Sequence, residues 1–333
     1  MKLLSALAAV LILTAIGLAG GSSGGLQSLF GIWIPYLAVA VFIAGIVAKV
    51  ISWGQSPVPF RIPTTCGQQR ALPWIPNDSL EAPHTTGAVL KRMFLEVFLF
   101  RTLFRNTRMK LQDGNLVYGS TKWLWLGALA FHYAFLTILI RHLRFFLEPV
   151  PALIAMMDKA DSFFQIGLPP MYQTDAVIFA ALAFLLARRL FEPQVRYISF
   201  ASDFFPLLLI AGIATTGILM RYFIRVDVTA IKQLAMSLAT FAPALPKEGI
   251  GSLFFAHLFL ICALLVYFPF SKLLHAPGIF LSPTRNLANT SREVRHVNPW
   301  NYPVKVHTYE EWEEEFHVPM KKAGFPLEKE YKE

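Results

Sequence analysis

The sequence predicts an all-α integral membrane protein built around a six-helix transmembrane bundle. Only 15% of its 333 residues are charged and 55% are hydrophobic, with a mean hydropathy of +0.50. A soluble domain of average composition carries about 25% charged residues. The hydrophobic residues also gather in separate runs close to the roughly 20 residues that a helix needs to cross a bilayer. Lipid is therefore the expected solvent for most of the chain.

Six apolar runs reach, or nearly reach, the length of a membrane span. The fourth is the weakest, because its apolar part is short and must borrow residues from both flanks. The third is expected to continue to about residue 146, and the sixth to about residue 275. The runs are residues 3–19, 30–48, 123–140, 176–187, 204–220 and 250–270.

The first run has two interpretations. Small residues follow it at positions 18–22, as at a signal-peptide cleavage site. Its charged leader, however, is Lys2 alone, and the next span follows within about ten residues. A retained transmembrane helix is the favoured interpretation.

Lysine and arginine predict the orientation. With the N-terminus in the cytoplasm, 23 of the 30 Lys and Arg residues fall in cytoplasmic segments and 7 in outer segments. This excess fits the positive-inside rule and predicts cytoplasmic N- and C-termini in a cell inner membrane. The formal charge of +9 is spread between apolar runs. Topology explains it better than a nucleic-acid partner does.

Four regions follow from these runs. Residues 1–51 form two N-terminal transmembrane helices, and residues 122–275 form the four-helix transmembrane core. Between them, residues 52–121 form a long cytoplasmic loop. Its first half is rich in proline, and residues 91–108 alternate Phe and Leu with Lys and Arg, as in an interfacial amphipathic helix. Residues 276–333 form a polar cytoplasmic tail, in which residues 309–323 are acidic first and basic last, an order that suits a helix dipole.

Four of the eight histidines lie in or at the ends of the third and sixth runs. In a six-helix chain these two helices are antiparallel. His142 then matches His257 in depth near the outer side, and His132 matches His275 near the cytoplasmic side. Axial haem ligands come from opposite faces of the ring at one depth, so these are the pairs that could each hold a haem.

The spacing agrees with two haems, one in each leaflet. The 18 residues between His257 and His275 make five helical turns, so both share one helix face about 27 Å apart. His132 and His142 are separated by about 15 Å along their helix. Neutral imidazole suits iron, and ligation by two histidines leaves no open position for oxygen.

A single histidine in such a helix is more often a satisfied core residue than a ligand, but four at matching depths favour ligands. We expect the other four to be surface residues, and His296 could instead contact a partner. Cys66 and Cys262 form no CxxC motif, which argues against c-type haem or an iron–sulfur cluster within this chain. The four remaining histidines are His84, His296, His307 and His317.

Arginines near the outer end are candidates for binding haem propionates. Arg141 and Arg144 flank His142, and Arg221 and Arg225 follow the fifth run. Charge-assisted hydrogen bonds to propionates would explain their position on the outer side, and snorkelling to lipid headgroups is the equally weighted alternative.

Quinol oxidation would also need a proton acceptor near the outer histidines. Asp158, Lys159, Asp161 and Asp227 are candidates, with ordinary loop charges as the more frequent case. Asp203 opens the fifth run and is expected to cap that helix.

The histidine pattern, His-x9-His with His-x17-His, resembles the NarI-type cytochrome b of respiratory nitrate reductases. The stretches 257–259, 272–275 and 282–287 (HLF, KLLH and SPTRNL) more closely resemble the DsrM family of membrane subunits in Dsr MKJOP complexes of sulfur metabolism. The resemblance covers residues 31–333. NarI-type chains have one helix fewer at the N-terminus, so the first helix here lies outside it.

The resemblance implies two b haems held by His132, His142, His257 and His275, and exchange of electrons with menaquinol. It also implies a cytoplasmic iron–sulfur partner resembling heterodisulfide reductase (DsrK-like), together with further membrane and extracytoplasmic subunits. The chain would then be an electron-transfer subunit of an oxidoreductase complex. Two alternatives stay open: a haem-containing anchor without its own quinone site, and a proton transporter with a histidine relay. The third, fifth and sixth runs carry no Asp or Glu between their ends, which argues against the transporter.

Overall fold

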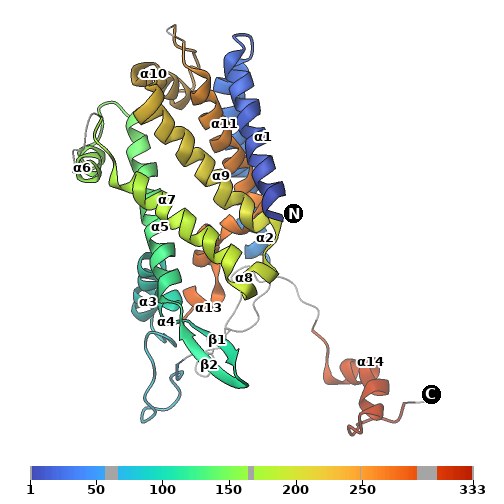
Figure 1. Ribbon diagram of the computed structural model, residues 1–333. Coiled ribbons are helices and arrows are strands. Elements are labelled where there is room, and N and C mark those ends of the chain that lie inside the picture. The colour runs from blue at the N-terminus through green and yellow to red at the C-terminus, as the bar shows by residue number, and fades with distance from the viewer. Residues whose placement is uncertain (1, 57–66, 164–168, 248, 291–305, 332–333) are drawn as a thin grey trace.

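The computed structural model describes residues 2–56, 67–163, 169–247, 249–290 and 306–331. Long helices run side by side in a bundle, and short elements gather at its two ends (Figure 1). Cys66 and His296 lie outside the described residues. Among the described residues, five helical segments are long and apolar enough to cross a membrane: Lys2–Ser22, Leu29–Gly54, Lys122–Phe145, Ala201–Ile224 and Ser252–Phe270.

These segments confirm the predicted all-α membrane fold. The weak fourth run is also a helix, α7 (Gln173–Phe191), which packs between α5 and α9. Its 19 residues measure about 28 Å, close to the thickness of a membrane core. It is less apolar than the five segments named above, because Asp175, Arg188 and Arg189 lie near its ends. The long helices are α1 (Lys2–Ser22), α2 (Ile34–Gly54) after the π-turn η1 (Leu29–Trp33), α5 (Lys122–His142), α9 (Ala201–Ile218) and α11 (Ser252–Tyr267).

Helix α1 packs antiparallel on α11 through glycines. A Cβ on Gly17 would lie 2.6 Å from the Cα of Ala256, and one on Gly21 would lie 2.7 Å from the Cβ of Phe255. Small residues four apart let two helix backbones approach closely, which is how helices gain packing energy in lipid. This close fit favours the interpretation of α1 as a retained helix.

The fit predicts a large cost for adding a side chain there. Gly17→Leu is expected to destabilise the protein by at least about 1–3 kcal/mol, because the obstructing atom belongs to the backbone of α11. Gly24→Leu is the matched control, since a Cβ at Gly24 meets nothing within 4 Å. Thermal unfolding in detergent measures both variants, and equal midpoints would show that α1 does not depend on this contact.

The loop after α2 corrects one prediction. The amphipathic helix expected over residues 91–108 is broken at Phe100, which has a left-handed φ of 50°. Helix α3 (Thr86–Leu99) comes before this break and α4 (Arg101–Arg105) after it. Helix α3 is nevertheless amphipathic, because Leu90 and Phe94 are exposed on one face. Arg92 is buried and donates to the Glu81 carbonyl on the other.

Helix α4 is followed by a β-hairpin, which the sequence analysis did not predict. Strands β1 (Thr107–Gln112) and β2 (Asn115–Ser120) pair antiparallel across a two-residue turn. Asp113 and Gly114 both have positive φ, 51° and 80°, as a type I′ turn requires. The Asp-Gly dipeptide is the sequence signal for this hairpin. Arg108 on β1 forms an ion pair with Glu192, which ties the hairpin to the end of α7.

The sixth span is also corrected, because it ends before His275. Helix α11 tightens into the 3₁₀ turn η4 (Phe268–Phe270), and the chain becomes extended at Ser271. Pro269 has no N–H to donate, which weakens the helix at this point. A second 3₁₀ turn, η5 (Lys272–Leu274), leads into the short helix α12 (His275–Gly278). The continuous helix assumed between His257 and His275 is therefore wrong.

Short elements cover the two ends of the bundle. Helices α6 (Ala152–Asp161) and α10 (Val228–Ala239) lie at one end, and α3, α4, the hairpin and α13 (Pro283–Asn286) lie at the other (Figure 1). The predicted topology makes these the outer and the cytoplasmic end. The remaining elements are η2 (Leu143–Phe145), α8 (Pro193–Ile198), η3 (Leu219–Ile224), η6 (Ile279–Leu281) and α14 (Tyr309–Lys322).

The tail helix α14 confirms the prediction over residues 309–323. Thr308 and Glu311 form a capping box at its start. Glu313 is only 1% exposed and accepts hydrogen bonds from the Glu328 N–H at 2.6 Å, the Lys329 N–H at 3.2 Å and the Tyr331 hydroxyl at 3.1 Å. The residues after α14 are thereby folded back onto the helix.

Acidification is expected to release this fold-back. Burial alone raises the pKa of Glu313, but the hydrogen bonds outweigh it and hold the pKa below its usual value. Such a group stabilises the fold above its unfolded pKa, about 4.3, and the stabilisation is lost as pH falls through the lower folded pKa. Hydrogen exchange of residues 325–331 should rise over that range beyond its intrinsic pH dependence. Glu313→Gln should raise it at neutral pH, whereas Glu314→Gln at an exposed position should not.

Candidate functional site

The structure brings the four predicted histidines together as two pairs. His132 on α5 and His275 at the start of α12 have ring centroids 5.9 Å apart, with ring planes at 84°. Both lie toward the cytoplasmic end of the bundle. The break at Ser271 carries His275 there, so the pair forms although α11 is not continuous.

The second pair lies toward the outer end. His142 is the last residue of α5, and His257 lies on α11, where it is 8% exposed. The two side chains are close enough to interact electrostatically. A Cβ on Gly217 would lie 3.3 Å from the His257 ring, so the glycine at this position of α9 leaves room for the ring.

All four rings are fixed through the same nitrogen. The Nδ1 atoms of His132 and His142 lie 2.7 Å from the carbonyl oxygens of Ala128 and Ile138, one helical turn earlier. The Nδ1 atom of His275 lies 2.9 Å from the Lys272 carbonyl oxygen. A carbonyl can only accept, so each Nδ1 carries the proton, and the Nε2 atom of the neutral ring keeps its lone pair for a metal.

The same logic applies to His257 through Thr216. Its Nδ1 lies 2.8 Å from the Thr216 hydroxyl oxygen. That hydroxyl has one hydrogen, and the carbonyls of Gly212 and Ile213, both at 2.9 Å, can accept it. When it donates to either of them, Thr216 accepts from His257 Nδ1, which leaves Nε2 of His257 unprotonated.

The inner pair has the spacing that two histidine ligands of one haem iron would need. A metal–nitrogen bond of about 2 Å on each side of the iron places the two imidazole centroids roughly 6 Å apart. The 5.9 Å between His132 and His275 matches this separation. Phe100 and Phe131 present ring edges to His132 at 5.0 and 5.1 Å, which supplies apolar surroundings. Among the described residues no three His, Cys, Asp or Glu side chains converge on a point that could hold a metal ion.

Three of the four predicted arginines meet at the outer end around Tyr172, and the fourth, Arg225, is exposed. The Tyr172 ring lies between the guanidinium groups of Arg141 and Arg221, 3.5 and 3.9 Å from its centroid. The Tyr172 hydroxyl donates to Asp158 at 2.7 Å and accepts from Arg144 at 3.2 Å. We call this group the outer cluster; its members are Arg141, Arg144, Asp158, Asp161, Tyr172, Asp175, Arg221 and Tyr222.

The cluster contains unfilled hydrogen-bond donors. Arg141 is 5% exposed, and its Nε and Nη1 atoms are buried without a hydrogen bond, as is Nε of Arg221. Arg141 Nη1 does lie 3.0 Å from an Asp161 oxygen, but as an ion pair. Buried donors of this kind suit an anionic acceptor, and a haem propionate is one. The propionate role of Arg141, Arg144 and Arg221 stays a prediction.

The four residues predicted as proton acceptors do not lie in one place. Asp158 and Asp161 lie in the outer cluster, whereas Lys159 is exposed. Asp227 caps α10 by accepting from the Thr229 N–H at 2.8 Å. Asp203 caps α9, as predicted, and also pairs with Lys272 at 2.6 Å.

Several residues of the site were missed. Thr216 and Gly217 carry no signal in a uniformly apolar run, because only packing against α11 gives them a role. Tyr172 and Asp175 come just before and inside the weak fourth span. An acidic residue at the start of an apolar run was the available signal for Asp175.

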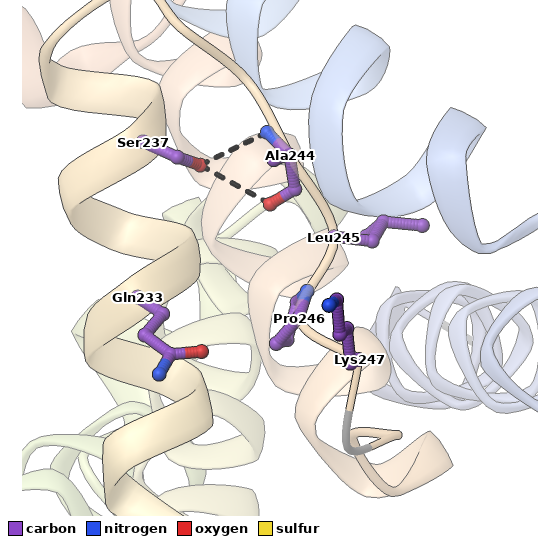
Figure 2. A pocket seen from close by; sticks show the side chains of 6 residues that line it. All are labelled: Gln233, Ser237, Ala244, Leu245, Pro246 and Lys247. Carbon is purple, nitrogen blue, oxygen red and sulfur yellow. Dashed lines mark hydrogen bonds between the residues drawn. The ribbon is translucent and has the colours of Figure 1, made fainter.

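A shallow surface hollow of about 290 Å³ lies beside α10 (Figure 2). Ser237 links α10 to the segment on the other side of the hollow, because its hydroxyl oxygen lies 3.2 Å from the Ala244 nitrogen and 3.3 Å from the Ala244 carbonyl oxygen. None of its lining residues is a predicted site residue. They are Gln233, Ser237, Ala244, Leu245, Pro246 and Lys247.

A bundle of membrane helices that carries paired, pre-oriented histidines is the architecture of a membrane protein of the cytochrome b type. The chain belongs to the nitrate reductase gamma subunit family, whose pattern matches residues 92–296, a range that includes all four histidines.

Two relatives share most of their length with this chain. A protein of Archaeoglobus fulgidus named "Hdr-like menaquinol oxidoreductase cytochrome b-like subunit" is 43% identical over 279 residues, covering 82% of this chain and 83% of the relative. A protein of the same name from Archaeoglobus profundus is 40% identical over 274 residues, covering 80% and 81%.

Proposed function

We propose that the chain is the di-haem b subunit of a respiratory membrane complex, which passes electrons from menaquinol to a cytoplasmic iron–sulfur subunit. His142 and His257 ligate the outer haem, and His132 and His275 ligate the inner haem. The observation that carries this proposal is the set of four imidazoles, each anchored through Nδ1 and arranged as two pairs. Both relatives are named as subunits of a menaquinol oxidoreductase, which supports menaquinol as the substrate.

When bound, the haems supply one-electron carriers across the membrane. The residues of this chain determine how they do so. Each Nδ1 hydrogen bond fixes the ring orientation and the tautomer, and makes Nε2 a better donor to iron. Two histidines per iron exclude oxygen as a ligand. The apolar helices around His257, which is 8% exposed, limit the access of water to the outer pair, whereas His275 of the inner pair is exposed.

The partner is expected at the cytoplasmic end. The loop 52–121 and the tail 276–333 lie beyond the inner pair under the predicted topology. We propose a heterodisulfide-reductase-like (DsrK-like) iron–sulfur subunit as that partner, within a Dsr MKJOP-type complex of sulfur metabolism. The 23 to 7 distribution of Lys and Arg supports this orientation in the cell inner membrane, with both termini cytoplasmic.

Haem quantification of the purified chain tests the proposal. The expected result is two b haems per chain, both reduced by a quinol in a detergent or lipid disc. A chain that binds haem but is not reduced by quinol would support the alternative of a haem-containing anchor. A chain without haem would contradict the proposal.

A further inference from the structure

One carboxylate of the outer cluster is incompletely paired. Asp175 lies in the first turn of α7, and its side chain is 15% exposed. Its Oδ2 accepts a hydrogen bond from the Tyr222 hydroxyl at 2.8 Å. Its Oδ1 lies 3.8 Å from Arg141 Nη2, too far for a hydrogen bond, and has no hydrogen-bond donor among the described residues.

The other two carboxylates of the cluster are each held by two donors. Asp161 accepts from the Thr174 N–H at 2.9 Å and the Thr174 hydroxyl at 2.6 Å, and Arg141 lies 3.0 Å away. Asp158 accepts from Arg144 at 3.0 Å and from the Tyr172 hydroxyl through one oxygen, Oδ1, and its side chain is 31% exposed to water. Asp175, at 15% exposed, is the more buried carboxylate with an oxygen that has no donor among the described residues.

A second observation points to a ligand beside Asp175. Arg141 contacts Asp175 and is almost fully buried, yet its Nε and Nη1 atoms make no hydrogen bond. Buried guanidinium donors are rarely left unfilled, because each costs free energy. An acceptor oxygen of a bound molecule would fill them next to the free carboxylate oxygen. The charged or titratable groups that face Asp175 are Arg141 from α5, Asp161 from α6, and Arg221 and Tyr222 from η3.

We propose that Asp175 is the proton acceptor of quinol oxidation at the outer end of the bundle, and that Arg141, instead of the propionate role predicted from the sequence, positions the quinol oxygen. This inference rests on the proposed function. Oxidation breaks two O–H bonds of the quinol and yields a quinone, two protons and two electrons. The electrons reduce two ferric haems to the ferrous state. Asp175 accepts each proton in turn and releases it to the outer water.

The location suits this chemistry. A general base must lie within hydrogen-bond reach of the proton it accepts and needs a lone pair free to accept it. Asp175 Oδ1 meets the second requirement, and its partial exposure gives the proton a way out. Arg141 is adjacent to His142 in the sequence, so the base and the outer pair occupy the same end of α5. Protons would leave on the outer side while electrons move inward, which conserves energy.

Replacement of the carboxylate by an amide tests the proposal. Asp175→Asn keeps the shape and can still accept from Tyr222, but it removes the base. In the haem-loaded full chain, the rate of haem reduction by a reduced naphthoquinone is expected to fall about a hundredfold. Its dependence on pH should flatten, and Asp175→Glu should restore part of the rate. Glu148→Gln is the control, since Glu148 is an exposed carboxylate of the same end that pairs with Lys232.

A second measurement does not use turnover. A hydrophobic carbodiimide reacts with protonated carboxyl groups, and mass spectrometry locates the adduct. Asp175 of the wild-type chain is expected to be labelled, and a bound naphthoquinone should protect it, whereas it should not protect Glu148. This result supports the inference even if Asp175→Asn fails to fold.

The outcomes separate the inference from the proposed function. Asp175→Asn with a wild-type rate and pH profile, or labelling that the quinone does not affect, would overturn the role of Asp175 and leave the proposed function intact. Wild-type haems that dithionite reduces but the quinol does not would instead refute the proposed function, and the inference with it.

Discussion

His132→Ala is expected to lower the haem content from two to one per chain. Alanine removes one of the two protein ligands of the inner iron, and His275 alone holds haem weakly. The outer pair, His142 and His257, shares no ligand with the inner pair and should keep its haem. The pyridine haemochrome assay gives the stoichiometry, and the reduced-minus-oxidised spectrum shows which haem remains.

Two further variants make this result specific. His84→Ala should keep both haems, because His84 lies in the loop and hydrogen-bonds to Asn77. His132→Gly should regain the second haem when imidazole is added to the medium, since the free ring can enter the space that the side chain leaves. A His132→Ala chain that retains two haems would exclude His132 as a ligand.

Thr216→Val is expected to weaken binding of the outer haem by about 10- to 100-fold, the usual effect of losing a hydrogen bond that orients a metal-ligating histidine. Valine has the shape of threonine but cannot accept the Nδ1 proton of His257, so a buried donor loses its partner. A less basic imidazole also stabilises ferric iron less, so the reduction potential of the outer haem should rise. Haem retention during dilution and a redox titration measure the two effects.

The neighbouring threonine is a matched control. Thr215 is exposed and donates to the Ala211 carbonyl at 2.7 Å, a local bond without contact to the histidines. Thr215→Val should leave the affinity and the potential of the outer haem unchanged. Equal behaviour of the two valine variants would show that the Thr216 hydrogen bond does not tune His257.

Most of the helices could be predicted because hydrophobic length decides them. A run of about 20 apolar residues satisfies all its backbone groups internally only as a helix when lipid surrounds it. The short elements at the ends were harder. The helix expected over residues 91–108 was wrong in its second half because the left-handed residue Phe100 has no sequence signal. The hairpin at β1 and β2 was missed although Asp113 and Gly114 gave a signal for its turn.

The histidine pairing was predictable for a similar reason. Antiparallel helices of known length bring particular residues to the same depth, whatever their side-chain contacts. The route to that result was partly wrong, because α11 ends at Tyr267 and the break at Ser271 carries the chain on to His275. The predicted match in depth between His132 and His275 still held. The depth of a residue depends on how far the chain has crossed the bundle, and a break in the helix does not change that.

The sequence by itself determined that this chain is a helical membrane protein with two depth-matched histidine pairs, because hydropathy and spacing act along the chain. Only the tertiary structure decided which groups orient those histidines and which charges meet at the outer end. Thr216 reaches His257 across 41 positions of sequence, and Arg141 meets Asp161 and Asp175 from separate helices. Such contacts depend on helix rotation and packing, which a run of apolar residues leaves unspecified.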